Sequence, residues 1–433
     1  MPSSRPLLSR RRLLGGAAVL AAIPLTASLA SCATSPRAEV AGVQPLGQTS
    51  FAAYAAETRA WVNARRKFVS DNPAAELRWN TPSETLPAGG AVGSCGILLI
   101  HGLGDSPWSF VDQARTYANA GWLVRTVLLP GCGTRPEDML EPTADDWRRV
   151  VREQAEILDR DLKTLHPGEK TEVWLGGFST GCNLAIEFAS RHEWISGLVL
   201  FSPAVEVRTH LAFMAPILAP FINWLRDPED SMMGGQTTFR YTIVPVQALA
   251  AFVDTMRSAE AALLRKPFDR PAVIMMSEHD SVVNTQALLE TFPKRFTNPR
   301  TRFLWYGSQS AASELSGNDP RIVVRSDYLP DENITSFSHM GLLYSPENPQ
   351  YGKEGLNRLC RLGDDRTSTT TCRGIPAKDI HYGAWGDKKR TGVTARLTFN
   401  PWFTEQEKDI LSVVNNSRLK SKALLSPAKA GST

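Results

Sequence analysis

The chain has 433 residues, of which 42% are hydrophobic and 21% are charged. This composition is typical of a globular protein with a large core, and it excludes a disordered, collagen-like or coiled-coil chain. The net charge of +4 comes from four arginines within residues 1–31, since the rest of the chain has 44 basic and 44 acidic residues. Because the rest of the chain has no net charge, a protein that binds nucleic acid through an overall positive charge is excluded.

Residues 1–31 predict a lipoprotein signal peptide. A basic run at residues 10–12 precedes an apolar stretch that ends in Leu-Ala-Ser-Cys at Cys32. This ending resembles the bacterial lipobox, whose cysteine receives the lipid, and the basic run resembles a twin-arginine export signal. The resemblance implies a lipid anchor on Cys32 in the cell envelope, facing the periplasm, and Ala33 favours the outer membrane over the inner one. The alternative is an uncleaved signal anchor.

An α/β core is expected to follow a polar tether over residues 32–50. Short apolar runs alternate with amphipathic stretches, which predicts a mostly parallel sheet with helices on both faces. Residues 51–203 are expected to form the first part of this core. Helices are predicted over residues 49–70, 106–120, 145–165 and 180–189, and strands over 96–100, 122–129, 172–175 and 195–201.

The second half of the chain departs from this alternation in two places. Residues 204–265 are apolar and rich in aromatic side chains, so we expect a helical cap there, with ordinary core helices as the alternative. Residues 266–433 are expected to form the second part of the core and a loop-rich C-terminal extension. The elements expected in that part are strands over 272–276 and 301–306, an irregular connection over 307–338 and a helix near 405–415.

The sharpest chemical signal is the sequence Gly177-Phe178-Ser179-Thr180-Gly181. It lies between a predicted strand and a predicted helix. A sharp strand–turn–helix element can present a serine hydroxyl in a strained turn, and small residues on either side let strand and helix approach. This context predicts Ser179 as a nucleophile, whereas the alternative is a serine helix cap in a glycine-rich turn.

A second turn, His101-Gly102-Leu103-Gly104, follows the strand predicted over residues 96–100. Backbone N–H groups in such a turn can stabilise the oxyanion of an acyl-transfer reaction. We predict the N–H groups of Leu103 and Thr180 as the pair of donors. His101 precedes the turn and is therefore expected to be structural.

The two turns are followed by an acidic residue at the end of a strand and then by a histidine. The types of these residues and their order along the chain resemble those of the α/β-hydrolases. The resemblance covers about residues 94–345. Within this range the chain is similar to monoacylglycerol lipases, small carboxylesterases and serine aminopeptidase-like hydrolases. It implies Asp280 as the acid and His339 as the base, with Glu278 and His381 as alternatives. The sequence departs from many relatives at Cys132, where they carry histidine.

The other cysteines indicate no metal site. Cys360 and Cys372 lie in a polar, loop-like stretch, and in an oxidising compartment they are the candidates for a disulfide. No Cys/His spacing is typical of metal ligands, and the mechanism implied by the resemblance needs no cofactor. The pairing of the remaining three cysteines stays open: Cys95, Cys132 and Cys182.

The resulting hypothesis is a membrane-anchored, extracytoplasmic serine hydrolase that cleaves carboxylic esters, with acyl or lipid esters favoured by the apolar cap. One alternative is a serine aminopeptidase-like peptidase that binds a substrate ammonium through acidic residues of the cap: Asp227, Glu229 and Asp230. The other is a non-catalytic envelope lipoprotein that keeps the fold. The presence of all three catalytic residue types in the expected order disfavours this second alternative.

Overall fold

The computed structural model describes residues 42–207, 213–226, 235–362, 370–371, 374–384 and 392–425. The predicted signal peptide, the lipidation site Cys32 and most of the tether lie outside these residues. The acidic residues of the cap, 227, 229 and 230, lie outside them as well. Within the described ranges, no helix has the length and apolar character needed to cross a membrane.

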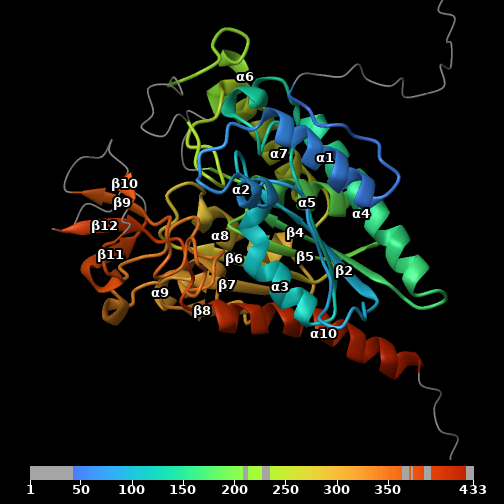
Figure 1. Ribbon diagram of the computed structural model, residues 1–433. Helices are drawn as coiled ribbons and strands as arrows, with labels where there is room; N and C mark the ends of the chain where they lie inside the picture. Colours follow the sequence, from blue (N-terminus) through green and yellow to red (C-terminus); the bar gives the residue numbers. More distant parts are fainter. Residues whose placement is uncertain are drawn as a thin grey trace, which may run out of the picture. The chain divides into compact units, whose positions relative to one another are not determined.

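The main element of the fold is an eight-stranded sheet, seen in the middle of Figure 1. Its strand order is β1-β3-β2-β4-β5-β6-β7-β8. Only β1 pairs antiparallel, with β3, while the other neighbouring strands are parallel. The predicted mostly parallel α/β sheet is therefore confirmed. Its strands are β1 (Glu84–Thr85), β2 (Cys95–Ile100), β3 (Leu123–Val127), β4 (Glu172–Phe178), β5 (Ile195–Phe201), β6 (Ala272–Ser277), β7 (Arg302–Tyr306) and β8 (Ile322–Arg325).

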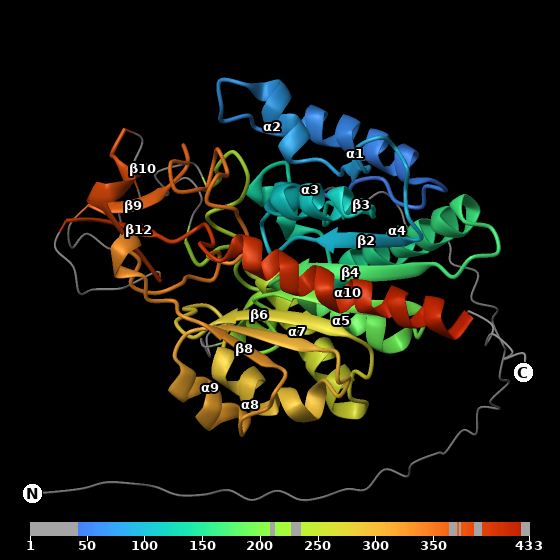
Figure 2. The ribbon, with the colours of Figure 1, turned by 90° about the horizontal axis from the view of Figure 1, so that it is seen from below.

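Helices cover both faces of this sheet. The ten α-helices of the described ranges are α1 (Phe51–Arg65), α2 (Pro73–Trp79), α3 (Val111–Asn119), α4 (Ala144–Leu165), α5 (Thr180–Arg191), α6 (Ala215–Leu218), α7 (Val246–Arg265), α8 (Thr285–Arg295), α9 (Gln309–Ser316) and α10 (Phe403–Leu425). Figure 2 shows α3 and α10 on one side of the sheet, and α4, α5 and α7 pack on the other.

The apolar runs of the strands follow from this double coverage. Side chains alternate between the two faces of a strand. In β2, Leu98 and Ile100 join the core under α4 and α5, whereas Ile97 and Leu99 join the core under α3 and α10. Every residue of the strand is buried. A strand buried on both faces therefore has no polar alternation in its sequence.

The region predicted as a cap differs from the expectation in its second half. Helix α7 fills the crossover between β5 and β6 and packs on α5. Its side chains Phe252, Val253 and Met256 belong to the core. A parallel connection needs such a crossover helix, so the second half of the region predicted as a cap belongs to the core layers.

The C-terminal extension contains a second sheet that the sequence did not predict. Its four strands have the order β10-β9-β12-β11, and β12 is antiparallel to β9 and parallel to β11. Figure 1 shows this sheet at the left of the main sheet. The strands are short: β9 (Leu359–Leu362), β10 (Thr370–Thr371), β11 (Ile380–Gly383) and β12 (Val393–Arg396).

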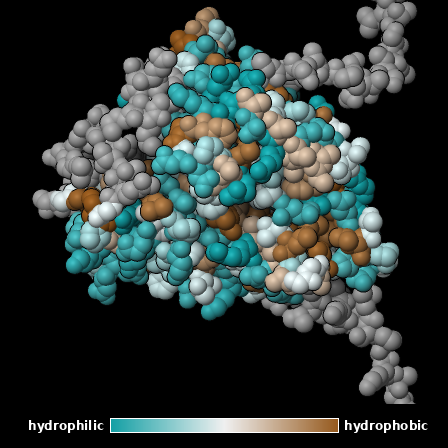
Figure 3. All heavy atoms as spheres, in the orientation of Figure 1, coloured by the Kyte–Doolittle hydropathy of each residue, from teal (hydrophilic) through white to brown (hydrophobic). Residues whose placement is uncertain are grey.

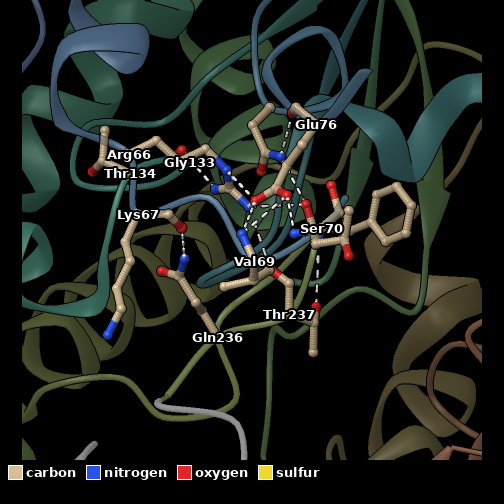
Figure 4. A network of polar contacts seen from close by, with 12 residues as sticks. Arg66, Lys67, Val69, Ser70, Glu76, Gly133, Thr134, Gln236 and Thr237 are labelled. Carbon is tan, nitrogen blue, oxygen red and sulfur yellow. Dashed lines mark hydrogen bonds and ion pairs between the residues drawn. The ribbon is translucent and has the colours of Figure 1, made fainter. Parts of the chain in front are cut away.

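A buried ion pair joins the N-terminal helices to the rest of the core (Figure 4). Arg66 Nη2 lies 2.6 Å from Glu76 Oε1, and both side chains are almost fully buried. Arg66 also donates to the carbonyl groups of Gly133 and Thr238. Glu76 accepts from the backbone N–H of Ser70 at 2.8 Å. The pair therefore connects α1 and α2 to the loop after β3 and to the segment before α7.

Candidate active site

Ser179 lies in the turn between β4 and α5 with φ 53° and ψ −113°, a backbone conformation that side-chain-bearing residues rarely adopt. The flanking glycines make this turn possible. A Cβ on Gly181 would lie 1.9 Å from the carbonyl oxygen of Ile100, and one on Gly177 would lie 2.4 Å from the N atom of Cys182. The glycines are therefore required by close backbone approach, and the turn places Ser179 at the carboxyl end of the sheet.

His339 and Asp280 form a hydrogen-bonded pair on two other loops at this end of the sheet. His339 Nδ1 lies 2.6 Å from Asp280 Oδ2. The other carboxylate oxygen accepts from the N–H groups of Val282 at 2.8 Å and Val283 at 3.2 Å. Burial raises the pKa of Asp280, but His339 and these two N–H groups outweigh burial and lower the pKa overall. Asp280 is thus held as a carboxylate that orients the imidazole.

Ser179 and His339 line one cavity of about 400 Å³, together with Leu103 and Thr180. Asp280 is fully buried and reaches this cavity through its bond to His339. The structure therefore brings together all five residues that the sequence singled out for the site. The other lining residues are Asp105, Phe178, Val207, Arg240, Tyr241, Leu249, Phe252, Ser281, Val282 and Arg396.

The alternative residues lie elsewhere. Glu278 accepts from the hydroxyl of Ser308 at 3.0 Å and does not line the cavity. His381 lies on β11 in the second sheet, away from the cavity lining. His101 is buried, with Nδ1 2.8 Å from the carbonyl of Gly102, and its Nε2 accepts from the N–H of Leu129. Burial also lowers the pKa of His101, so this imidazole is neutral and structural.

Three serines that the sequence analysis did not single out hold the loop of His339. Ser202 donates to the carbonyl of His339 at 3.1 Å, and Ser277 donates to the carbonyl of Phe337 at 3.0 Å. Ser338 donates to the carbonyl of Leu397, after β12. Ser202 directly follows β5 and Ser277 ends β6, so a serine at the carboxyl end of a predicted strand was the available signal.

Two arginines of the cavity were also missed. Arg240 comes from the segment before α7, and Arg396 comes from β12. They are 156 residues apart in the sequence and belong to segments predicted as cap and loop. No local pattern marks either residue, because their proximity depends on the second sheet.

The cysteine predictions have mixed outcomes. Cys360 is disulfide-bonded, and Cys372 lies outside the described residues, so the pairing of these two cysteines stays a prediction. Cys132 and Cys182 are buried and form no disulfide, and Cys95 is buried within β2. In the part of the chain that the structure describes, no group of three or more His, Cys, Asp or Glu side chains is arranged to hold a metal ion.

Comparison with known proteins places this geometry in a family. The sequence pattern of the alpha/beta hydrolase family matches residues 97–311, which span the strands that carry Ser179 and Asp280. The chain belongs to this family. This α/β-hydrolase is 29% identical over 197 residues to a thermostable monoacylglycerol lipase of Bacillus sp. (strain H-257), and the alignment covers 44% of this chain and 72% of that protein. It is an enzyme of the serine hydrolase class.

Solved structures with a related fold include lipolytic enzymes. One belongs to the metagenome-derived lipolytic enzymes LipS and LipT and has 23% identity and a TM-score of 0.42. The match covers 54% of this chain and 90% of that structure's chain. Another is a soluble variant of monoglyceride lipase from Saccharomyces cerevisiae, with 15% identity and a TM-score of 0.40. That match covers 55% of this chain and 88% of the yeast protein.

Proposed function

We propose that this α/β-hydrolase cleaves carboxylic esters through an acyl-enzyme on Ser179, with His339 as the base and Asp280 as the orienting acid. The observation that carries the proposal is the shared cavity of Ser179 and His339, in which Asp280 fixes the Nδ1 side of the imidazole. That hydrogen bond directs Nε2 to accept a proton, which is the role of the base in such a triad.

In this mechanism His339 Nε2 takes the hydroxyl proton of Ser179 as Oγ attacks the ester carbonyl. The N–H groups of Leu103 and Thr180 stabilise the oxyanion. Thr180 is the first residue of α5, so its N–H has no acceptor within the helix, and the helix N-terminus favours negative charge beside it. The alcohol leaves with the proton from His339, and water then releases the acid and restores Ser179.

Acyl or lipid esters are the substrates that the surroundings of the site favour. Val207, Leu249 and Phe252 give the cavity an apolar wall suited to an acyl chain. Near α6, Phe221 is 82% exposed, and Ile217 and Leu225 are also largely exposed. Figure 3 shows a small group of apolar residues at the top of the molecule in this view, where Figure 1 places α6. The similarity to a monoacylglycerol lipase supports the same substrate class.

The proposal also includes export and a lipid anchor at Cys32, which rests on the basic run, the apolar stretch and the lipobox-like ending of residues 1–32. We expect the full chain to incorporate an alkyne-tagged fatty acid and to sediment with membranes. Cys32→Ser would abolish the label. Equal labelling of the two proteins would contradict the anchor.

The test of the catalytic assignment is labelling by a fluorophosphonate, which reacts with activated serines. We expect the wild-type chain to be labelled and to hydrolyse p-nitrophenyl esters, and we expect Ser179→Ala to do neither. His339→Ala should lose labelling because Ser179 then has no base. Labelling that persists in Ser179→Ala would refute the assignment, and a folded wild-type protein without labelling would favour a non-catalytic role.

A further inference from the structure

Two cationic side chains line the cavity of Ser179 and His339, and the mechanism above uses neither of them. Arg240 enters from the segment before α7, and Arg396 enters from the end of β12. The segments that carry them come from different parts of the chain, so neither arginine belongs to the strand–turn–helix unit of Ser179. Their convergence on one cavity therefore calls for a role in binding.

Arg240 is held in place by the residues around it. Its guanidinium forms an ion pair with Asp105, and Nη1 contacts Met340 Sδ. The side chain is only 15% exposed, and its buried Nε has no hydrogen-bond partner among the described residues. A buried guanidinium with an unused donor gains from an additional acceptor.

Arg396 lies beside the base. Its Nε lies 3.4 Å from the hydroxyl of Ser338, the residue before His339. The pKa of Arg396 is lowered to about 10, mainly by burial and also by the charge of Arg240, while Asp280 raises it in part. Guanidinium groups keep their proton in proteins. The lowered pKa thus reflects mainly the cost of burying this cation, together with its position near the cation Arg240, and an anion in the cavity would offset both.

The carboxylates nearby are already engaged. Asp105 accepts from the N–H of Ser106 with one oxygen and pairs with Arg240 through the other. Asp280 is fully buried and accepts hydrogen bonds from His339 and two backbone N–H groups. A ligand in the cavity therefore meets the donors of the two arginines rather than an open acidic group.

We propose that the ester cleaved at Ser179 carries an anionic group, a carboxylate or a phosphate, that Arg396 and Arg240 bind while the ester carbonyl lies at Ser179. This inference rests on the proposed ester hydrolysis and names its substrate class. The planar fork of a guanidinium suits both anions, because two parallel N–H groups match two oxygens. Arg396, contributed by the second sheet, is then a determinant of specificity that the α/β core itself does not contain.

The kinetic test compares matched esters with and without the anion. One pair carries the charge on the acyl side: the p-nitrophenyl half-ester of glutaric acid and p-nitrophenyl pentanoate. The other carries it on the alcohol side: a medium-chain acylglycerol phosphate and the same acylglycerol. We expect the wild-type kcat/KM to favour the anionic ester in one pair, and the pair that responds identifies the anion.

The variants then assign that preference to Arg396. In Arg396→Gln the charged-to-neutral ratio of kcat/KM should fall by at least about tenfold, as loss of a charge-assisted hydrogen bond predicts. Arg396→Lys should retain part of the ratio, because it keeps the charge. Arg265→Gln, at the exposed end of α7, is the matched control and should keep the wild-type ratio. A wild-type ratio near one in both pairs would overturn the inference, as would an equal loss for charged and neutral esters.

A binding measurement separates this inference from the proposed hydrolysis. The Ser179→Ala variant is titrated calorimetrically with glutarate and with glycerol phosphate. The same titrations are made with the double variant that carries both Ser179→Ala and Arg396→Gln. We expect one of the anions to bind and to lose at least about tenfold in affinity with the second change. If fluorophosphonate labelling fails but an anion binds through Arg396, the proposed hydrolysis is wrong and the anion site stands. If labelling succeeds and neither anion binds, the anion site is wrong.

Discussion

At Ser179 and Ser202 the backbone adopts positive φ angles of 53° and 46° at the ends of neighbouring strands. Such conformations cost about 1–3 kcal/mol each and persist where the surrounding structure imposes them. Here the N–H of Ser179 donates to the carbonyl of Phe201, and the N–H of Ser202 donates to the carbonyl of Met275. The sheet thus imposes both turns, so that one serine faces the cavity and the other reaches the backbone of His339.

Ser202 is expected to act as a positioning residue. In Ser202→Ala the carbonyl of His339 loses its 3.1 Å hydrogen bond, and the loop of the base is held less firmly. We expect kcat to fall about tenfold, which corresponds to one lost hydrogen bond, with little change in KM. Steady-state kinetics on a soluble ester tests this. Ser412→Ala, on the exposed side of α10, is the control and should match the wild type, whereas a pure rise in KM for Ser202→Ala would contradict the role.

Two of the central site residues have a local mark in the sequence. Ser179 stands in a glycine-flanked turn between a strand and a helix, and Asp280 follows a strand. His339 required the resemblance to the α/β-hydrolases, since a histidine in a loop has no mark of its own. Arg396 was out of reach: its relation to Ser179 depends on the pairing of β9, β11 and β12, which no local pattern encodes.

Among the elements, the attachment of α1 and α2 depends on the Arg66–Glu76 pair. Glu76→Gln leaves a buried guanidinium without its counter-charge, so we expect the free energy of unfolding to fall by about 3–5 kcal/mol. Urea denaturation followed by circular dichroism measures this loss. Lys266→Met breaks the exposed pair with Glu193 and is the matched control, with an expected change of less than about 1 kcal/mol. A change of that small size in Glu76→Gln would show that the buried pair contributes little.

The exposed segment at α6 is expected to contact aggregated substrate. Phe221→Ser removes the most exposed large apolar side chain of the described residues. We expect activity on a micellar long-chain ester to fall about tenfold, because the apolar contact with the aggregate is lost, while activity on a soluble short-chain ester changes little. Leu264→Ser is the control, since Leu264 is 67% exposed on α7. If the activity of Phe221→Ser relative to the wild type is the same on the micellar and the soluble ester, the segment at α6 does not contact aggregated substrate.

Elements with a strong apolar pattern were the ones the sequence predicted well. The strand β2 is buried on both faces. The helix α4 has one apolar face and begins at a capping box formed by Thr143 and Asp146. The strand β8 was missed because all four of its residues are only half-buried at the sheet edge. The strands of the second sheet were missed because they are short and lie between polar stretches of sequence, whose composition predicts irregular structure.

For the molecule as a whole, Glu407 on α10 couples stability to pH. Burial raises the pKa of this carboxyl to about 8, although Gln406 and Tyr117 lower it in part. Between its usual value near 4.5 and 8, the folded protein therefore binds a proton that the unfolded chain has released. The contribution of Glu407 is fully present below that window and is lost as the pH rises through it.

Glu407→Gln should remove this dependence, because an amide has no proton to release. We expect the free energy of unfolding of the wild type to decrease between pH 5 and 8 by a few kcal/mol more than that of the variant, as a shift of several pKa units implies (about 1.4 kcal/mol for each). Urea denaturation at a series of pH values measures both curves. Glu405→Gln, on the same helix, is the control and should follow the wild type. Parallel curves for the wild type and Glu407→Gln would contradict the raised pKa.

The hydrogen bond that holds the loop of His339 can form only late in the synthesis of the chain. The loop of His339 is tied by Ser338 to Leu397, and the helix that closes this face of the sheet, α10, begins only at Phe403. Ser179 leaves the ribosome more than 200 residues before Leu397 does. On the proposed assignment, a nascent or prematurely ended chain carries Ser179 without a fixed His339, and we expect hydrolysis to begin only when the chain extends beyond Leu397.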